Sequence, residues 1–543
     1  MADIKNVSVV GHTTSSSPRP HVVYTIAVKR EDGTSYELHK RYSEFVALHE
    51  ALGDPHRLPP KRILATHFVP SAWVDDALIS ERKSGLGLYL SDLISSKTSS
   101  PLLDAFLSPP TTSSKRPALH PEDALPSTLS RKTALSLKEA QGEVQAAASS
   151  LIAASYYPDW AADTLAPESI DFSKFDILFF AFATPNSSST ISWDDGATGT
   201  LKRLVSAANS SGKGTKIVLS IGGWGGSYYF SQAMSTSANR TKFVNAAVSA
   251  VNTYGLAGID IDWEYPNSSG AGNPFSSSDS ANLLSFFKSL RTALGSSKII
   301  SAAVTQQPWL GSNGSPLTDV SAYAAQMTYV NIMNYDVWGA SATPGPNAPL
   351  GNLCGNATQP QASAQAAFAA WTKAKMPANK LLLGLPLYGY VSKSTKTTLT
   401  KIAMPPAGFV PSIHQARPVF LNNKHERARP STTIHAEAAA GDLSSYFGQQ
   451  IAFNQIIALG ALKKSGSVYV QANGYTEGWD DCSDTPFLFN TSRSTVVTYD
   501  DTYSLADKAA YAKSSGMAGC FTWSMDQDDG YSLQNVIRSS LGK

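Results

Sequence analysis

The feature that most constrains the fold is a series of eight short apolar runs, separated by helix-like stretches, between residues 151 and 526. Near-continuous apolar runs are typical of strands that are buried on both faces, and strands that alternate with helices form parallel sheets. Eight of them close into a (β/α)8 barrel. The sequence therefore predicts a barrel with strands within residues 151–158, 175–183, 216–224, 258–266, 298–309, 329–336, 380–390 and 516–526.

One of these runs, GIDIDWEYP, carries a carboxylate at every second position. Successive side chains of a strand point to opposite faces, so the three acids share one face and the residues between them point to the core. A row of buried acids is costly unless each is paired, hydrogen-bonded or protonated. The acids are Asp260, Asp262 and Glu264, and the residues between them are Ile259, Ile261 and Trp263.

Barrels of this kind hold their chemistry at the carboxyl ends of the strands. No basic residue stands near the acids in the sequence to explain them as ion pairs. We therefore predict that Asp262 and Glu264 are functional and that Asp260 supports them from one step deeper in the strand.

Polar and aromatic residues also end other predicted strands, and we expect them at the same edge of the barrel. They are Gln306, Asp336, Tyr388 and Trp523. Four further tryptophans near strand ends could stack on a ligand or pack in the core, and both interpretations stay open. These are Trp160, Trp224, Trp309 and Trp338.

Four segments resemble the signature strands of the family 18 glycoside hydrolases, the chitinase family, in that family's order. They are SIGG at Ser220–Gly223, GIDIDWEYP, MNYD at Met333–Asp336, and FTWSMDQDDG, which contains Trp523. The resemblance covers residues 155 to 543. For the residues of SIGG we favour a structural role in a tight turn and close packing. The family pattern usually begins with a further acid or amide where this chain has Ala257, and we expect this to alter the pH dependence at most.

In this family the 2-acetamido group of the substrate serves as the nucleophile. The resemblance implies that Glu264 is the general acid, that Asp262 orients the acetamido group, and that Asp260 shares a proton with Asp262. It implies that Tyr335 binds the acetamido oxygen and that Asp336 positions the sugar and tunes Glu264. No metal or cofactor is implied. The further substrate-binding residues that we expect are Met333, Trp523, Trp160, Trp224 and Tyr388.

More than a hundred residues separate the seventh and eighth predicted strands, and we expect a small insertion domain at about residues 391–510. Within it, residues 448–462 have the pattern of a helix and residues 468–490 that of hairpin strands. Residues 392–440 match no pattern.

The first 110 residues combine strand-like alternation with two helical patterns, and a Pro-, Ser- and Thr-rich linker follows at 111–150. The segments KRYSEF, LPPKR and ERKSGLGLYL resemble the three marks of a Phox-homology (PX) domain, a small α+β domain that binds phosphoinositides. The resemblance implies phosphatidylinositol 3-phosphate as the usual ligand. The expected phosphoinositide-binding residues are Arg41, Tyr42, Lys61 and Arg82.

Charge and cysteine content set further limits. The net charge of +2 points to no polyanionic partner, so we expect no nucleic acid ligand. Three cysteines are too few for a disulfide scaffold, and Cys520 stands in an apolar run typical of a core position.

The sequence thus favours a hydrolase of β-1,4-linked N-acetylglucosamine in chitin or chito-oligosaccharides, joined to a module for phosphatidylinositol 3-phosphate membranes. A glycan-binding lectin on the same barrel and a membrane-trafficking adaptor with the barrel as passenger are alternatives. An endo-N-acetylglucosaminidase acting on N-glycans would share the mechanism. Glu264 argues against the lectin, because a lectin needs no acid there.

The two parts of the chain predict different cellular locations. The first residues lack the basic and apolar regions of a signal peptide, and a PX domain binds cytosolic leaflets, which favours the cytoplasm or an endosomal or vacuolar surface. The barrel carries seven Asn-x-Ser/Thr sequons, which are acceptors only in the secretory pathway. If the barrel is a separate secreted protein, and two neighbouring genes have been read as one, we expect it outside the cell.

Overall fold

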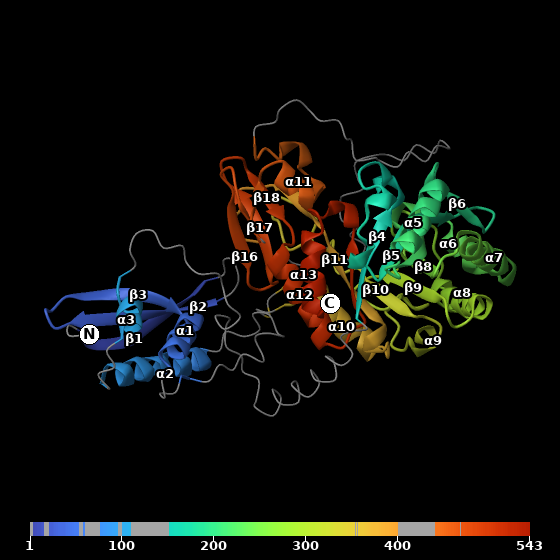
Figure 1. The fold of residues 1–543 in the computed structure, drawn as a ribbon. Helices are drawn as coiled ribbons and strands as arrows, with labels where there is room; N and C mark the ends of the chain where they lie inside the picture. The colour runs from blue at the N-terminus through green and yellow to red at the C-terminus, as the bar shows by residue number, and fades with distance from the viewer. Residues whose placement is uncertain are drawn as a thin grey trace. The chain divides into compact units, whose positions relative to one another are not determined.

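The fold was analysed in a computed structural model of the chain (Figure 1). The structure describes residues 4–15, 21–53, 58–59, 76–95, 100–109, 151–352, 355, 357–399, 440–466 and 468–543. The expected linker, Lys61 and residues 400–439 of the 392–440 stretch lie outside these residues. The chain divides into two compact units, Met1–Glu143 with Gly478–Asp484, and Val144–Glu477 with Thr485–Lys543.

The N-terminal unit is an α+β fold, as predicted. Its antiparallel sheet has the order β1 (Ile4–Ser15), β2 (His21–Arg30), β3 (Ser35–Arg41), followed by helices α1 (Tyr42–Leu52), α2 (Asp76–Ser95) and α3 (Pro101–Phe106). Alternate residues of β2 are buried, so one face of the sheet supplies the core. The core residues on this strand are Val22, Tyr24, Ile26 and Val28.

The second unit contains the predicted barrel. Its eight strands run parallel in the order β4-β19-β11-β10-β9-β8-β7-β5, and pairing of β4 with β5 closes the ring (Figure 1). The closed ring confirms the predicted fold class. The strands are β4 (Ile152–Pro158), β5 (Ile177–Pro185), β7 (Lys216–Gly222), β8 (Gly258–Asp262), β9 (Ile299–Val304), β10 (Tyr329–Ile332), β11 (Leu381–Pro386) and β19 (Gly519–Trp523).

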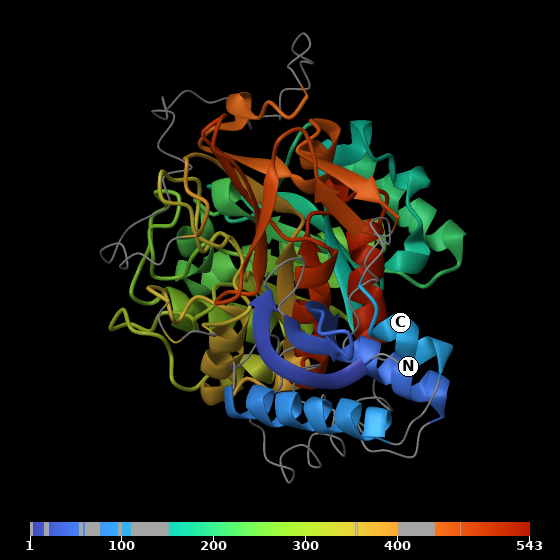
Figure 2. The same cartoon turned by 90° about the vertical axis from the view of Figure 1, so that its left-hand side faces the viewer.

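Helices follow most of the strands and cover the outside of the ring (Figures 1 and 2). They are α5 (Ala197–Ser211), α6 (Phe230–Ser235), α7 (Ser237–Tyr254), α8 (Asp279–Leu294), α9 (Ser321–Ala324), α10 (Ala364–Lys373), α12 (Thr502–Ser514) and α13 (Ser532–Leu541). A short strand, β6 (Ile191–Trp193), extends β5 in an antiparallel hairpin. Single 3-10 turns are η3 (Asp159–Asp163), η4 (Pro167–Ser169), η5 (Phe172–Lys174), η6 (Trp224–Gly226), η7 (Ala378–Lys380), η9 (Ser444–Tyr446) and η10 (Met525–Gln527).

The barrel strands are apolar on both faces because each face meets a separate core. On β5, Leu178 and Phe180 belong to the layer between strands and helices, whereas Ile177 and Phe179 belong to a second cluster with residues of the other strands. This double burial explains why the sequence runs are nearly continuous. Among the described residues, no helix is both long and apolar enough to cross a bilayer.

The insertion between strands β11 and β19 is an antiparallel sheet, which confirms that an insertion separates the seventh and eighth barrel strands. Its first strand begins at Tyr388, within the predicted barrel strand 380–390. The sheet has the order β13-β12-β18-β17-β16, and β14 pairs with β15 beside it. Figure 2 shows its later strands side by side in orange and red. The elements are β12 (Tyr388–Lys393), β13 (Gln449–Ala452), α11 (Phe453–Ala458), β14 (Leu462–Ser465), β15 (Val468–Gln471), β16 (Thr476–Asp480), β17 (Thr485–Asn490) and β18 (Thr495–Thr498).

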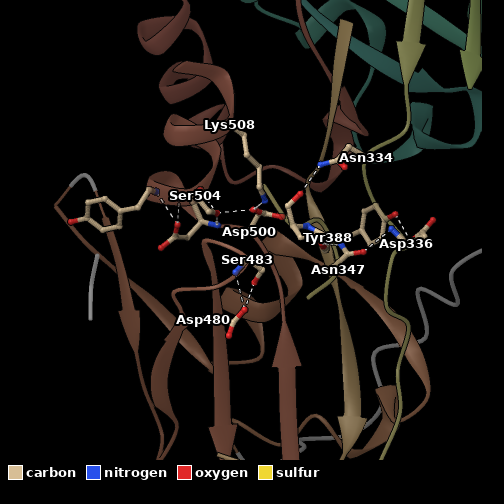
Figure 3. Close-up of polar contacts among 12 residues, drawn as sticks. Asn334, Asp336, Asn347, Tyr388, Asp480, Ser483, Asp500, Ser504 and Lys508 are labelled. Atoms are coloured by element: carbon tan, nitrogen blue, oxygen red, sulfur yellow. Dashed lines mark hydrogen bonds and ion pairs between the residues drawn. The ribbon is translucent and has the colours of Figure 1, made fainter. Parts of the chain in front are cut away.

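The predicted helix at 448–462 is wrong at both ends, because α11 spans only Phe453–Ala458 and Leu462 begins β14. Residues Gln449–Ala452 pair with β12 as an edge strand, and the helix begins only at Phe453. Pairing with a neighbouring strand outweighs the local pattern here. Beyond β18, the buried Asp500 accepts hydrogen bonds from Ser504 and Lys508 of α12 (Figure 3), which ties the end of the sheet to a barrel helix.

Close backbone contacts between barrel strands require glycine at particular positions. A Cβ atom on Gly258 would lie 2.0 Å from the carbonyl oxygen of Ile299 on the adjacent strand. We expect Gly258→Ala to lower the free energy of unfolding by about 2–4 kcal/mol, because β8 and β9 would have to separate. Urea unfolding followed by tryptophan fluorescence measures the change.

Gly199→Ala is the matched control, since Gly199 lies in α5 and a Cβ there would meet no atom within 4 Å. Alanine is favoured over glycine inside helices, so this variant should gain about 0.5–1 kcal/mol. Equal stability of the two variants would contradict the close packing of β8 against β9.

Candidate active site

The three acids lie at the carboxyl end of β8 and are all buried. Their exposed fractions are 0% for Asp260, 4% for Asp262 and 9% for Glu264. The alternating Ile259, Ile261 and Trp263 point the other way, into the layer between strands and helices.

Neighbouring strands supply hydrogen-bond donors to Asp260. Ser220 of β7 and Ser301 of β9 stand directly opposite it in the strand register. Their hydroxyl groups donate to the two carboxylate oxygens, both at 2.7 Å. Tyr156 donates at 2.9 Å and the amide of Asn331 at 3.2 Å. Burial raises the pKa of Asp260, and the three hydroxyl hydrogen bonds oppose this effect.

The side chain of Asp262 is buried with an unsatisfied oxygen. Its Oδ1 atom accepts no hydrogen bond from the described residues, whereas its backbone carbonyl accepts from Gly223 N at 2.8 Å. Burial and the nearby Glu264 and Asp260 raise the pKa of Asp262 well above its usual range. A buried acceptor of this kind suits a donor from a ligand. Among the described residues, no hydrogen bond joins the side chains of the two aspartates, so their shared proton stays a prediction.

Glu264 has a raised proton affinity. Its pKa is raised to about 8, and burial is the largest cause. A hydrogen bond from Tyr265 opposes this rise, and the charge of Asp336 adds to it. The carboxyl group is therefore largely protonated at neutral pH. Its backbone is fixed on both sides, because the N–H donates to Ser227 Oγ and the carbonyl accepts from Asn273 Nδ2, each at 3.0 Å.

Asp336 lies in the loop after β10 and adopts a positive φ of 56°. Its backbone N–H donates to Asn347 Oδ1 at 2.9 Å, and the amide of Asn347 donates to the carbonyl of Tyr388 at 3.1 Å (Figure 3). The hydroxyl groups of Tyr388 and Tyr390 donate to its Oδ1 atom at 2.6 and 2.5 Å. The insertion strand β12 thus holds this carboxylate from the side.

An aromatic cluster closes the ends of β4, β5 and β19. The rings of Trp523 and Phe182 stack with centroids 5.6 Å apart, and Tyr156 lies 5.3 Å from Trp523. Trp160 lies 6.5 Å from Trp523 and is 38% exposed. The exposed ring of Trp160 and the half-buried ring of Trp523 are suited to contact a sugar, which is apolar on its ring faces.

The other predicted site residues lie in different settings. Trp309 is a core residue, because its ring packs between Tyr323 and Trp371. Tyr335 is buried with its ring 6.1 Å from that of Tyr388. The remaining four, Gln306, Met333, Trp224 and Trp338, are half-buried.

The glycines of the SIGG segment have the structural role that we favoured. Gly222 has φ +121°, and a Cβ there would lie 2.1 Å from the carbonyl oxygen of Asp262. Gly223 has φ +85° and would press a Cβ against the ring of Phe182. They let β7 pass close beside the acidic strand.

In the N-terminal unit, three of the four predicted residues lie within the described part of the chain. Arg41 and Arg82 are 7% and 4% exposed, and Arg82 lies with its guanidinium carbon 4.4 Å from the ring centre of Tyr42. The hydroxyl of Tyr42 donates to the carbonyl of Pro59 at 2.6 Å. Tyr42 thus supports Arg82 from inside the unit, and its contact with an inositol ring stays a prediction. Lys61 lies outside the described residues.

Sequence reasoning missed several residues of the barrel site. The sequence held a partial signal for four of them. Strand alternation places Tyr156, Ser301 and Asn331 at inward positions, and Tyr265 directly follows the general-acid candidate. The role of Gln450, which reaches Asp336 from β13, has no local signal. Across the described part of the chain, no group of three His, Cys, Asp or Glu side chains is suited to hold a metal ion.

Comparison with known families agrees with this geometry. The model of the glycosyl hydrolases family 18 matches residues 152–528, and the PX domain model matches residues 28–110. A chitinase-like effector of Moniliophthora roreri is 35% identical over 426 residues, which cover 77% of this chain and 98% of the relative. A chitinase-like effector of Moniliophthora perniciosa is 33% identical over 405 residues, covering 73% and 88%.

Among solved structures, a chitinase from Rhizomucor miehei is 33% identical with a TM-score of 0.57, covering 72% of this chain and 99% of its own. A mutant class V chitinase from Nicotiana tobaccum, in complex with NAG4, has the same fold at 20% identity and a TM-score of 0.55, covering 72% and 99%. The chain therefore belongs to glycosyl hydrolase family 18, and it carries a PX domain on the N-terminal side of the family 18 barrel.

Proposed function

We propose that the barrel hydrolyses β-1,4-linked N-acetylglucosamine in chitin or chito-oligosaccharides with retention of configuration. The observation that carries this proposal is the presence of two complementary groups side by side in the acid row. Glu264 has a pKa raised to about 8, and Asp262 has a buried oxygen that accepts no hydrogen bond from the described residues. One group offers a proton at neutral pH, and the other accepts a hydrogen bond. Substrate-assisted cleavage needs both.

In the first step, Glu264 donates its proton to the glycosidic oxygen and the bond from that oxygen to the anomeric carbon breaks. The acetamido carbonyl oxygen of the same sugar bonds to the anomeric carbon, which gives an oxazolinium ion. Asp262 accepts a hydrogen bond from the acetamido N–H and stabilises the developing positive charge. In the second step, Glu264 takes a proton from water, the water oxygen bonds to the anomeric carbon, and the oxazolinium ring opens.

Glycan binding without turnover is the second candidate, because two relatives carry the name chitinase-like effector. Glu264 favours hydrolysis over binding alone. A buried carboxyl group costs stability, and binding alone gives no reason to keep one there. An N-glycan substrate is compatible with the same acids.

For the N-terminal unit we propose phosphoinositide binding. Two buried guanidinium groups support this proposal: Arg41 precedes Tyr42 in the chain, and Arg82 lies over its ring. Arginine side chains bind phosphate through paired hydrogen bonds. Membranes that contain phosphatidylinositol 3-phosphate are the expected partner.

Glu264→Gln tests the acid. It should lower kcat on chitotetraose by about three orders of magnitude or more and leave the affinity within about threefold, because the amide keeps the shape and loses the proton. Glu477→Gln is the matched control, since burial also raises the pKa of Glu477, to about 7, on strand β16 away from the acid row. Full activity of the Glu264 variant, or equal losses in both variants, would sink the assignment.

The pH dependence follows from the raised pKa of Glu264. The acid must be protonated, so kcat/KM should fall as the pH rises through about 8. Tyr265→Phe removes a hydrogen bond that lowers this pKa, and the alkaline limb should therefore move to higher pH. Initial rates between pH 4 and 10 measure both limbs. An alkaline limb that moves to lower pH in the variant would contradict the assigned hydrogen bond.

Arg41→Ala should reduce binding to vesicles with phosphatidylinositol 3-phosphate at least tenfold and leave chitotetraose hydrolysis unchanged. Lys29→Ala removes the same charge from an exposed position on β2 and should keep vesicle binding. Vesicle sedimentation gives the measurement. If wild type binds these vesicles no better than phosphatidylserine vesicles, the headgroup pocket is wrong.

A further inference from the structure

Two strands of the insertion direct side chains onto one carboxylate of the barrel. Tyr388 and Tyr390 are two residues apart on β12, so both point to the same face of the sheet. Gln450 of β13 stands directly opposite Tyr390 in the antiparallel register. Side chains of a directly opposed pair lie on the same face and interact. All three converge on Asp336.

The three side chains form a connected hydrogen-bond network. The Gln450 amide nitrogen lies 2.9 Å from the Tyr390 hydroxyl oxygen and 3.4 Å from Asp336 Oδ1. By donating to that hydroxyl oxygen, the amide leaves the phenolic hydrogen to Asp336, where the distance is 2.5 Å. Hydrogen bonds in such a chain strengthen one another.

Donors gathered on one carboxylate oxygen favour the charged form of the carboxylate. Among the described residues, the titratable groups that interact with Asp336 are Glu264 and Tyr265 just after β8, its chain neighbour Tyr335, and Tyr388 and Tyr390 of β12. The pKa values of the two β12 tyrosines are raised by burial and by Asp336, so they stay protonated donors. The charge of Asp336 in turn favours the protonated form of Glu264.

We propose that Gln450 and Tyr390 are positioning residues of the active site: through their hydrogen bonds they hold Asp336 charged and oriented beside the general acid. This role rests on the proposed hydrolase function. It gives the insertion a part in the reaction, because neither residue belongs to the barrel strands. Both are expected to act through Asp336 rather than by touching the bond that breaks.

Gln450→Glu in the full chain tests the proposal. The change keeps the shape of the side chain and places a second carboxylate beside Asp336, and like charges so close favour proton binding by the pair. The acid limb of the pH–rate profile on chitotetraose should move up by about one pH unit or more. The value of kcat should fall at least about tenfold at pH 5 and less than about threefold at pH 8.

Gln449→Glu is the matched control. Gln449 is the next residue of the same strand, points to the other face, and donates to the carbonyl of Ser445 at 3.2 Å. Gln449→Glu adds the same charge a few ångströms away from Asp336. The pH–rate profile of this variant should therefore follow that of wild type. Tyr390→Phe should move the acid limb in the same direction as Gln450→Glu, because it removes the 2.5 Å donor.

A stability measurement checks the contact without catalysis. The paired carboxyl groups of Gln450→Glu bind protons more tightly in the folded state than in the unfolded state. The stability of this variant relative to wild type should therefore fall as the pH rises from about 4 to 7. Thermal unfolding across this range should show the trend for Gln450→Glu and not for Gln449→Glu.

Each outcome decides the matter. A shifted acid limb in Gln450→Glu and Tyr390→Phe, with Gln449→Glu unchanged, supports the proposal. If the stability of Gln450→Glu depends on pH as expected but the acid limb of its pH–rate profile does not move, the proposal is overturned. The contact with Asp336 would then exist without affecting catalysis. If wild type hydrolyses nothing, the proposed function fails and chitotetraose affinity at pH 5 decides: a loss of at least fivefold in Gln450→Glu alone supports the positioning role, and equal affinities overturn it.

Discussion

Three carboxylates in a row on one strand are tolerable inside a protein only if the surrounding strands compensate for their charge. Asp260, the deepest, accepts hydrogen bonds from four side chains on four other strands. Asp262 and Glu264 have fewer donors, and burial raises the pKa of both. The anchored acid fixes the strand, and the two acids nearer the mouth carry the raised proton affinity that the proposed chemistry uses.

The insertion completes this arrangement from outside the barrel. Asp336 follows strand β10 with a positive φ, and two hydroxyl groups of β12 donate to its carboxylate. Asn454, at the start of α11, also donates to the carbonyl of Asp526 at 2.8 Å, close after Trp523. The insertion thus contacts two loops at the carboxyl ends of the barrel strands.

Sequence patterns predicted the features that depend on local order. Apolar runs marked the eight strands, and alternation placed the three acids on one face, because both follow from the geometry of a single strand. The donors to Asp260 depend instead on register between strands far apart in the chain, as with Asn331. Pairing between distant strands also explains why Gln449–Ala452 form a strand although their sequence pattern is helical. The role of Gln450 likewise depends on the pairing of β13 with β12.

The configuration of the first product tests the central claim most directly. Proton NMR of chitotetraose during the first minutes of reaction separates the α and β anomers of the new reducing end before they interconvert. Substrate-assisted cleavage by Asp262 and Glu264 predicts that the β anomer forms first. Two successive displacements at the anomeric carbon restore the β configuration of the substrate. Initial formation of the α anomer, or no product with the wild-type chain, would contradict the account.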